Sequence, residues 1–411
     1  MQKTVRSVIS AMLLLAAATT AQAASVEELE KQVEDLAAQV RAIKAAGGGT
    51  AANPGAKDEG AVKKALEQTR FGGYGELDYI FKRENGNGKG GNTFDPHRFV
   101  LYVNSPLADW VTLNAELEWE HGGDSSEKNG EVAIEQTFLD FTIARPSNIK
   151  AGVLLVPLGA INPYHEPTNF NSTERPELDR FLIPSTWEEM GAGIHGALGS
   201  RVNYELLVMN GLDGSKFSAK DGIRKGRQDL DGDVNRNKAV VGRIEIRPAT
   251  NLYTNFSFYT GNSAKVGTAY TTIAAFDGRY SIGNFDIAGE YVHIYQDNPG
   301  SLGVTDIGNR MSGYWVEGAY HLMPKSLKKG KLAEADAVLF ARYSEFDTQQ
   351  GNVASGISGL YDRNYTTFGV VFKPVTTLAI KADYQIYDDQ RGAGELPLDN
   401  DKFQLTLGFV F

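Results

Sequence analysis

Polar and apolar residues alternate along most of the chain, and this alternation restricts the fold more than any other feature. The segment 111–119 reads VTLNAELEW, and the segment 403–411 reads FQLTLGFVF. Because successive side chains of a strand point to opposite faces, such segments are strands with one apolar and one polar face. They are long enough for the roughly 9–11 residues that a tilted strand needs to cross a membrane, whereas strands of a soluble sandwich usually have about 5–6.

The links between these strands alternate between short and long. Short turns are predicted at 105–106, 145–148, 199–200, 248–250, 283–284 and 374–376, with a longer one at 324–333. Long links are predicted at 84–97, 121–130, 157–188, 211–237, 261–269, 296–309, 347–362 and 389–401. Short turns on one rim and long loops on the other are typical of outer-membrane barrels, and a sheet can cross lipid only when it is closed. The sequence therefore predicts an all-β fold, a 16-stranded antiparallel transmembrane β-barrel.

Three short segments precede the predicted barrel. Residues 1–23 have a basic start, a short apolar run and the cleavage sequence Ala21-Gln22-Ala23, which is the pattern of a signal peptide. In 24–46, apolar residues repeat at alternating spacings of three and four, which predicts a short periplasmic coiled-coil helix; an amphipathic helix lying on the barrel is the alternative. Residues 47–69 are rich in glycine and alanine and are predicted to be a flexible linker, so the barrel spans 70–411.

Composition excludes several classes of function. The chain has no cysteine, which rules out disulfides, thiolate metal sites and iron–sulfur clusters. The net charge of −10 argues against a nucleic-acid partner, because such proteins carry a concentrated basic face. The sequence thus gives no reason to expect a cofactor, and no serine nucleophile motif suggests an enzyme.

The long link 157–188 contains the most specific sequence motifs of the chain. These are Phe170-Asn171, the run RPELDR at 175–180, the run IPSTW at 183–187, and Gly191. Together with the strand at 150–153 and the sequence PLG at 157–159, they resemble the phosphate-selective porin O and P family. That resemblance implies a trimeric outer-membrane channel in which 157–188, here called the constriction loop, folds into the lumen.

Strand parity predicts which charged side chains face the lumen, and among them acids outnumber bases. This predicts a weak preference for cations, because acidic rings favour cations and basic rings favour anions. The predicted inward bases are Lys150, Arg243, Arg247, Arg279, Arg342, Lys373 and Lys381. The predicted inward acids are Glu76, Asp78, Glu116, Glu118, Glu120, Asp140, Glu245, Asp277, Asp286, Glu290, Glu317 and Asp383.

The constriction loop is itself charged. We predict that His165, Glu166, Glu174, Arg175, Asp179 and Arg180 line the narrowest part of the pore. Two interpretations of these charges stay open. They act on permeating ions, or they pair with one another and fix the shape of the loop.

A second long link contains an acidic repeat. Oxygen ligands at Asp229, Asp231, Asp233 and Asn235, with a glycine for the turn, suit a structural calcium ion. The closing glutamate of the EF-hand pattern is missing, so a solvated acidic loop tip is the alternative.

These observations favour a passive porin in the bacterial outer membrane. A barrel of this size is too wide for side chains to fill, so a water-filled channel for small hydrophilic solutes or ions is expected. Its expected partners are outer-membrane lipids and two further copies of the chain in a homotrimer. The alternatives are an anion- or phosphate-selective channel of the same family, and a barrel that sheathes an electron-carrying cytochrome.

Overall fold

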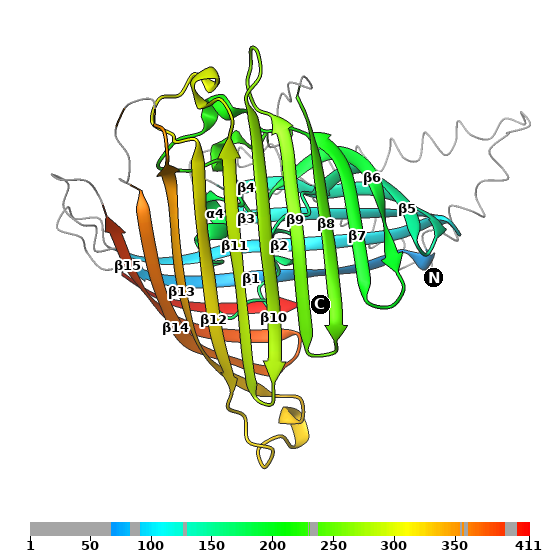
Figure 1. Cartoon of the computed structure of the whole chain (residues 1–411). Coiled ribbons are helices and arrows are strands. Elements are labelled where there is room, and N and C mark those ends of the chain that lie inside the picture. Colours follow the sequence, from blue (N-terminus) through cyan, green and yellow to red (C-terminus); the bar gives the residue numbers. More distant parts are fainter. Residues whose placement is uncertain are drawn as a thin grey trace, which may run out of the picture. The chain divides into compact units, whose positions relative to one another are not determined.

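The computed structural model describes residues 67–82, 91–125, 130–228, 230, 237–353, 356, 361–390 and 401–411. The predicted signal peptide and coiled-coil segment lie outside these residues, as does nearly all of the predicted linker. Within the described part of the chain, sixteen antiparallel strands close into one barrel (Figure 1). The predicted barrel is confirmed. No helix among the described residues has the length and apolar character needed to cross a membrane.

Each strand pairs with its neighbours in sequence, and β1 closes the barrel by pairing with β16, for example Leu77 with Leu407. The strands are β1 Arg70–Lys82, β2 Gly91–Ala108, β3 Val111–Ser125, β4 Gly130–Ala144, β5 Ser147–Leu155, β6 Glu188–Leu198, β7 Val202–Asn210, β8 Lys238–Ala249, β9 Leu252–Asn262, β10 Tyr270–Ile282, β11 Phe285–Gln296, β12 Arg310–His321, β13 Asp336–Gln350, β14 Asp362–Val375, β15 Leu378–Gln390 and β16 Lys402–Val410.

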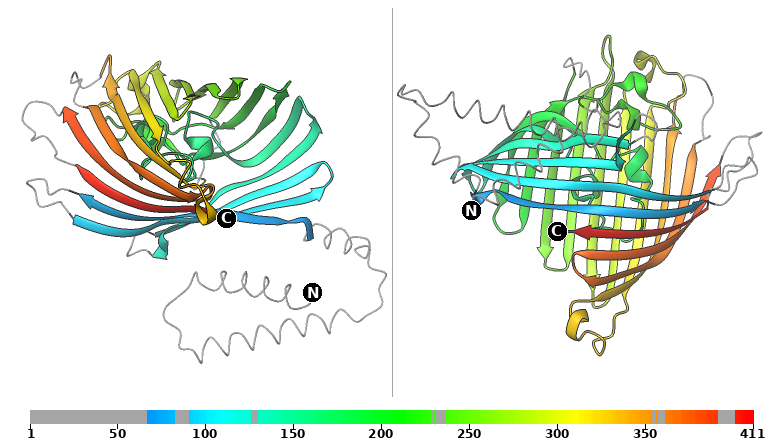
Figure 2. Two further views of the ribbon diagram at one scale, coloured as in Figure 1. Left: turned by 90° about the horizontal axis from the view of Figure 1, so that it is seen from below. Right: turned by 180° about the vertical axis from the view of Figure 1, so that it is seen from behind.

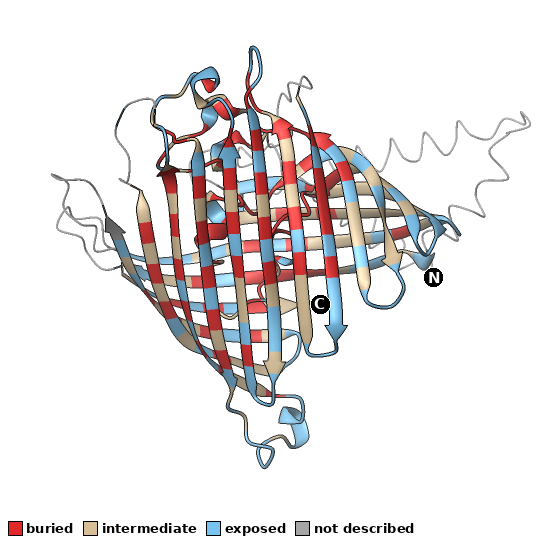
Figure 3. Ribbon diagram, in the orientation of Figure 1, coloured by how far each residue is buried: buried red, intermediate tan, exposed pale blue. Residues whose placement is uncertain are grey.

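The alternation of the sequence becomes an alternation of environment in the strands. In β9, Asn255 and Ser257 are buried, while Phe256 between them is 48% exposed. The same banding of buried and exposed positions runs along the neighbouring strands in Figure 3. An exposed apolar outer face and a buried polar inner face are what a barrel in lipid requires.

Several predicted strand ends were wrong, among them the end of β3, which runs to Ser125 although a link was predicted from 121. The turn predicted at Ser105-Pro106 lies instead at Asp109 and Trp110, because the β2–β3 ladder continues past Pro106, which pairs with Thr112. A register shift after Pro106 lets β2 extend to Ala108. The long link predicted at 84–97 is also too long, since β2 begins at Gly91.

Strand β4 contains a bulge at Glu135. Glu116 of β3 pairs with Gln136, and the next β3 residue, Leu117, pairs with Ile134, so Glu135 has no partner of its own in the ladder. A bulge of this kind re-aims a side chain. Glu135 is only 2% exposed and faces the interior beside Glu116, a position that simple parity does not predict.

The barrel interior is partly filled. In Figure 2, seen from below, segments of the chain lie within the ring of strands. Apolar residues of the constriction loop, such as Leu178 and Trp187, join one buried cluster with inward residues of the wall, such as Leu207 and Ile273, and with Phe217 of the 211–237 link. Packed side chains therefore occupy part of the barrel interior nearest the long links, beside the expected water-filled channel.

Candidate channel and constriction loop

The neck of the constriction loop is held by one buried amide. Asn162, which is fully buried, donates from Nδ2 to the carbonyls of Val156 (2.7 Å) and Trp187 (3.0 Å). Its Oδ1 accepts from the backbone N–H of Trp187 at 2.8 Å, and the N–H of Val156 donates to the carbonyl of Trp187 at 2.9 Å. These bonds tie the two legs of the loop together where it leaves β5 and enters β6.

The first part of the loop is fastened to the wall at β8, β9 and β11. The N–H of Gly159 donates to Ser257 Oγ at 3.0 Å, and the N–H of Ala160 donates to Glu290 Oε1 at 3.0 Å. Arg243 donates to the carbonyl of Gly159 at 2.6 Å. It also pairs with Glu245 at 2.9 Å. The inward charges on this part of the wall therefore hold the loop.

The tip of the loop is fastened to β13, β15 and β16. Arg342 donates to Ser172 Oγ at 2.7 Å, and Lys381 donates to the carbonyl of Ser172 at 2.8 Å. The ammonium of Lys381 also lies 4.0 Å from the ring centroid of Phe170. Asp383 accepts from the N–H of Thr173 at 2.6 Å. Lys381 has no exposed surface, so it binds the loop and does not face open solvent.

The charged residues of the constriction loop fall into two groups. Most are paired: Glu166 accepts from Asn169 at 2.5 Å, Glu174 pairs with Lys402, and Arg175 donates to Thr186 Oγ1 at 3.0 Å. Arg180, by contrast, is exposed at the end of α4, Leu178–Phe181, with its guanidinium 5.6 Å from the ring centroid of Phe181.

Asp179 and His165 of the constriction loop are buried. Asp179 has no exposed surface, and this burial raises the pKa of its carboxyl to about 7. His165 is 3% exposed, and its Nε2 lies 2.9 Å from Glu135. Asp179 and His165 are thus buried where the constriction loop contacts the barrel wall, a region here called the seat of the loop.

On β1–β3 most of the inward charges are buried as well. Arg98 binds Glu76 through Nε at 3.0 Å and Nη2 at 2.9 Å, and its Nη1 lies 3.9 Å from Glu118. Glu116 and Glu118 are 4% and 6% exposed. These acids contribute to the predicted excess of inward acids, yet little of their surface meets the lumen.

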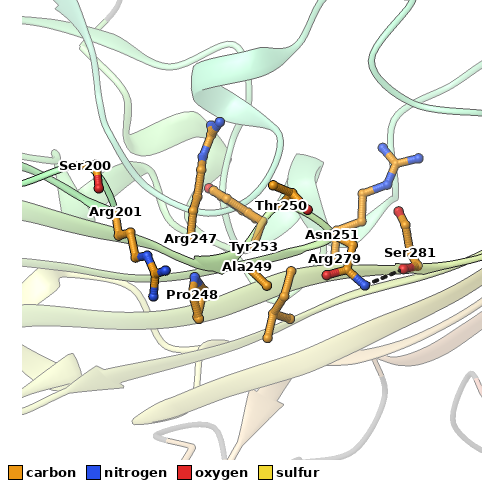
Figure 4. A pocket seen from close by; sticks show the side chains of 11 residues that line it. Ser200, Arg201, Arg247, Pro248, Ala249, Thr250, Asn251, Tyr253, Arg279 and Ser281 are labelled. Atoms are coloured by element: carbon orange, nitrogen blue, oxygen red, sulfur yellow. Dashed lines mark hydrogen bonds between the residues drawn. The ribbon is translucent and has the colours of Figure 1, made fainter.

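Two cavities open onto the inner wall near the short turns. The larger, of about 640 Å³, lies among the ends of β7 to β10 and contains three arginines and no acid among its lining residues. Figure 4 shows the guanidinium groups of Arg247 and Arg279 extending to the same side, and Arg201 extending to the other. Arg247 and Arg279 are exposed, and Arg279 pairs with Asp286 at 3.2 Å.

The second cavity, of about 460 Å³, lies between the constriction loop and strands β5 to β8. Tyr164 of the loop and Glu205 of β7 line it. Lys150 binds that glutamate at 2.5 Å, so its charge is compensated. His195, which also lines the cavity, pairs with Asp140 at 3.0 Å.

The structure thus separates the predicted pore-lining residues. Arg243, Lys381, Glu116 and Glu118 are buried against the constriction loop or within the wall. Lys150 is half-buried in an ion pair, and Arg247 and Arg279 remain exposed near the short turns.

The sequence analysis did not identify three further functional residues, Arg98, Glu135 and Arg363. Arg98 and Arg363 each directly follow a predicted long link, 84–97 and 347–362, and the bulge hides the inward position of Glu135. The guanidinium of Arg363 lies 4.7 Å from the Phe181 ring centroid.

All four predicted calcium ligands lie outside the described residues: Asp229, Asp231, Asp233 and Asn235. That site stays a prediction.

None of the protein-family models matches the chain. A sequence relative, an uncharacterized protein of Aquifex aeolicus (strain VF5), is 28% identical over 384 residues, which are 87% of this chain and 83% of the relative. The resemblance to the phosphate-selective porin O and P family is accordingly not confirmed.

Solved structures share the fold at low sequence identity. The outer membrane channel DcaP of Acinetobacter baumannii has a TM-score of 0.56 and 12% identity, covering 84% of this chain and 97% of DcaP. The anion-selective porin from Comamonas acidovorans has a TM-score of 0.54 and 11% identity over 84% and 99%. The trimer form of OmpT, an outer membrane protein of Vibrio cholerae, has a TM-score of 0.51 and 13% identity over 84% and 99%. The chain therefore has the fold of outer-membrane porins.

Proposed function

We propose that this chain is an outer-membrane porin that lets small hydrophilic solutes and ions diffuse passively across the bacterial outer membrane. The observation that carries the proposal is the reversed polarity of the barrel, with exposed apolar side chains outside and buried polar ones inside, combined with a long loop hydrogen-bonded to the inner wall. A loop that is fixed inside a barrel narrows the lumen, and this alone does not form a catalytic site. Selectivity then depends on width and wall charge.

The geometry supports a different charge preference from the one that the sequence suggests. Most of the acids on the inner wall are buried, and several of them hold the constriction loop, as Glu290 and Asp383 do. The cavity near the short turns is lined instead by Arg201, Arg247 and Arg279. We therefore propose a weak preference for anions at this rim, in place of the weak cation preference predicted from strand parity.

A planar lipid bilayer experiment tests both parts of the proposal. The purified, folded chain should insert into the bilayer and give stepwise increases in conductance. In a tenfold gradient of potassium chloride, the sign of the zero-current potential should show that chloride passes more easily than potassium. Adding inorganic phosphate to the same bilayer asks whether phosphate reduces the chloride current, as the phosphate-selective alternative requires. Folded protein that inserts without conducting would refute the porin, and the opposite sign of potential would refute the anion preference alone.

We further propose that the porin is a homotrimer, by analogy with the trimer form of the Vibrio cholerae protein. Light scattering of the detergent-solubilised chain measures the protein mass in the particle and distinguishes three copies from one. The cytochrome-sheath alternative is disfavoured, because the constriction loop and the apolar cluster around Trp187 occupy part of the space that a threaded partner would need.

A further inference from the structure

Three buried side chains converge where the constriction loop meets β3 and β4. Glu116 comes from β3, Glu135 from the bulge of β4, and His165 from the loop. Each offers a ligand atom, and these atoms all lie within 4.8 Å of one another. The three residues are only 2–4% exposed, so the group is part of the seat of the loop.

The hydrogen bonds around this group leave the converging atoms free. His165 Nδ1 lies 2.9 Å from the carbonyl of Asn162, and since a carbonyl can only accept, Nδ1 carries the hydrogen. In the neutral ring Nε2 then carries no hydrogen, and it lies 2.9 Å from Glu135 Oε1. Gln136 donates to Glu116 Oε2 at 2.5 Å. Glu116 Oε1, both oxygens of Glu135 and His165 Nε2 have no hydrogen-bond partner.

Such an arrangement needs positive charge at its centre. Buried carboxylates without partners are costly, and an imidazole nitrogen without a hydrogen is repelled by a carboxylate oxygen only 2.9 Å away. Two arginines whose charge acts on Glu135 are engaged elsewhere: Arg98 binds Glu76 and approaches Glu118, and Arg175 donates to Thr186 Oγ1. A divalent cation would offset both carboxylates while the imidazole stays neutral, which leaves the group without net charge.

The donor set also selects the kind of cation. One imidazole nitrogen and two carboxylates suit zinc and neighbouring first-row metals, which bind such ligands at about 2.0–2.2 Å. Calcium prefers about 6–8 oxygen ligands. The hydrogen bond from Nδ1 to the carbonyl of Asn162 is the outer contact that commonly orients a metal-binding histidine. The ring is further fixed by Tyr74, whose centroid lies 6.1 Å away at 73°.

We propose that Glu116, Glu135 and His165 bind one divalent first-row metal ion, with zinc as the reference case, and that this ion fastens the constriction loop to the barrel wall. The inference goes beyond the proposed porin function and does not depend on it. The bulge at Glu135 has a purpose in this account, because it brings a second carboxylate to the side of the wall that Glu116 already faces.

The test measures metal binding directly. The full chain is purified in detergent, stripped with a chelator, exposed to zinc and desalted, and zinc is counted by plasma mass spectrometry. We expect about one ion per chain, and at least a tenfold weaker affinity in the variants Glu135→Gln and His165→Asn. The matched control is His195→Asn, which removes a histidine that also pairs with a wall carboxylate, Asp140, and it should bind zinc as the wild type does.

Two further measurements keep the test decisive. Glu116→Gln keeps the shape of the side chain and its contact with Gln136, so it should fold if any variant does; heat-modified electrophoretic mobility reports folding. X-ray absorption of the zinc-loaded wild type should show nitrogen and oxygen ligands in a set that includes a histidine. Absence of zinc from the folded wild type, or binding unchanged by Glu135→Gln and His165→Asn, would overturn the proposal.

Discussion

Two regions of the inner wall carry charged side chains at inward strand positions and use them in opposite ways. Where the constriction loop lies against the wall, Arg243, Lys381 and Asp383 are buried and hydrogen-bonded to the loop backbone. Near the short turns, Arg247 and Arg279 are exposed around a cavity of about 640 Å³. In both regions these side chains occupy strand positions that face the barrel interior. The regions differ only in whether the constriction loop covers them.

This difference shows why counting inward charges does not give the field that a permeating ion meets. A buried charge paired with a backbone group or another charge mainly stabilises the fold, whereas an exposed charge is available to ions and is screened by salt. The excess of acids on the inner wall therefore serves mainly to hold the loop in place. The exposed arginines are the charges that an ion meets at one entrance of the channel.

The largest expected effect comes from removing a buried arginine. Arg98→Met leaves Glu76 buried without its partner, which should lower the free energy of unfolding by about 3–5 kcal/mol. The matched variant at the rim is Arg279→Met, which also breaks an Arg–Asp pair, but the Arg279 side chain is 49% exposed, so we expect a loss of about 0–1 kcal/mol. Urea unfolding in lipid vesicles, followed by tryptophan fluorescence, measures both.

The double variant Arg98→Met with Glu76→Leu checks the reason for that effect. If the loss comes from an unpaired buried carboxylate, removing the carboxylate should restore a large part of the stability. Equal losses in Arg98→Met and Arg279→Met would remove the distinction between the two regions.

A smaller effect is expected at the neck of the constriction loop. Asn162→Ala removes three hydrogen bonds and leaves buried backbone groups unsatisfied, which should cost about 1–3 kcal/mol and increase current noise in single channels. Asn169→Ala is the control, because that exposed side chain donates to the carbonyl of Tyr164 and to Glu166, both within the loop, and we expect a loss of less than about 0.5 kcal/mol. Unchanged noise and stability in Asn162→Ala would mean that the loop is held by its wall contacts alone.

The sequence predicted the barrel well and its inner organisation poorly, for physical reasons. Alternation has a period of two in any strand, so the strand number and the two faces follow from it. The bulge at Glu135 breaks that period by one residue and was invisible to parity. Pro106 was assigned to a turn although the ladder continues through it. Which charges the loop covers depends on contacts such as Arg342 with Ser172, 170 residues apart in sequence, and no local pattern encodes them.

A third prediction concerns pH in the loop-covered region. Burial raises the pKa of the Glu174 carboxyl, but the ammonium of Lys402 outweighs it and holds the pKa at about 2, below the ordinary value of 4.5. Because the folded-state pKa is the lower one, the stabilisation is complete above about 4.5 and is lost as pH falls toward 2. The Glu174→Gln variant should be less stable by up to about 1 kcal/mol at pH 6, since the glutamate is 27% exposed.

Unfolding measured from pH 6 down to pH 3 checks the sign. The wild-type curve should approach that of Glu174→Gln as the solution is acidified. A gap that stays constant or widens on acidification would contradict the assigned pairing with Lys402.

The most direct test of the rim comes from reversing its charge. The double variant Arg247→Glu with Arg279→Glu should lower the free energy of unfolding by no more than about 1 kcal/mol, because both side chains are exposed and the pair with Asp286 lies at the surface. It should nevertheless move the zero-current potential toward cation preference in 0.1 M salt. The shift should shrink in 1 M salt, where charges are screened beyond about 3 Å. Arg201→Glu, whose side chain extends to the other side in Figure 4, should shift the potential less. If the double variant left the potential unchanged, the ions would be selected in the loop-covered region, and the roles assigned to the two regions would have to be exchanged.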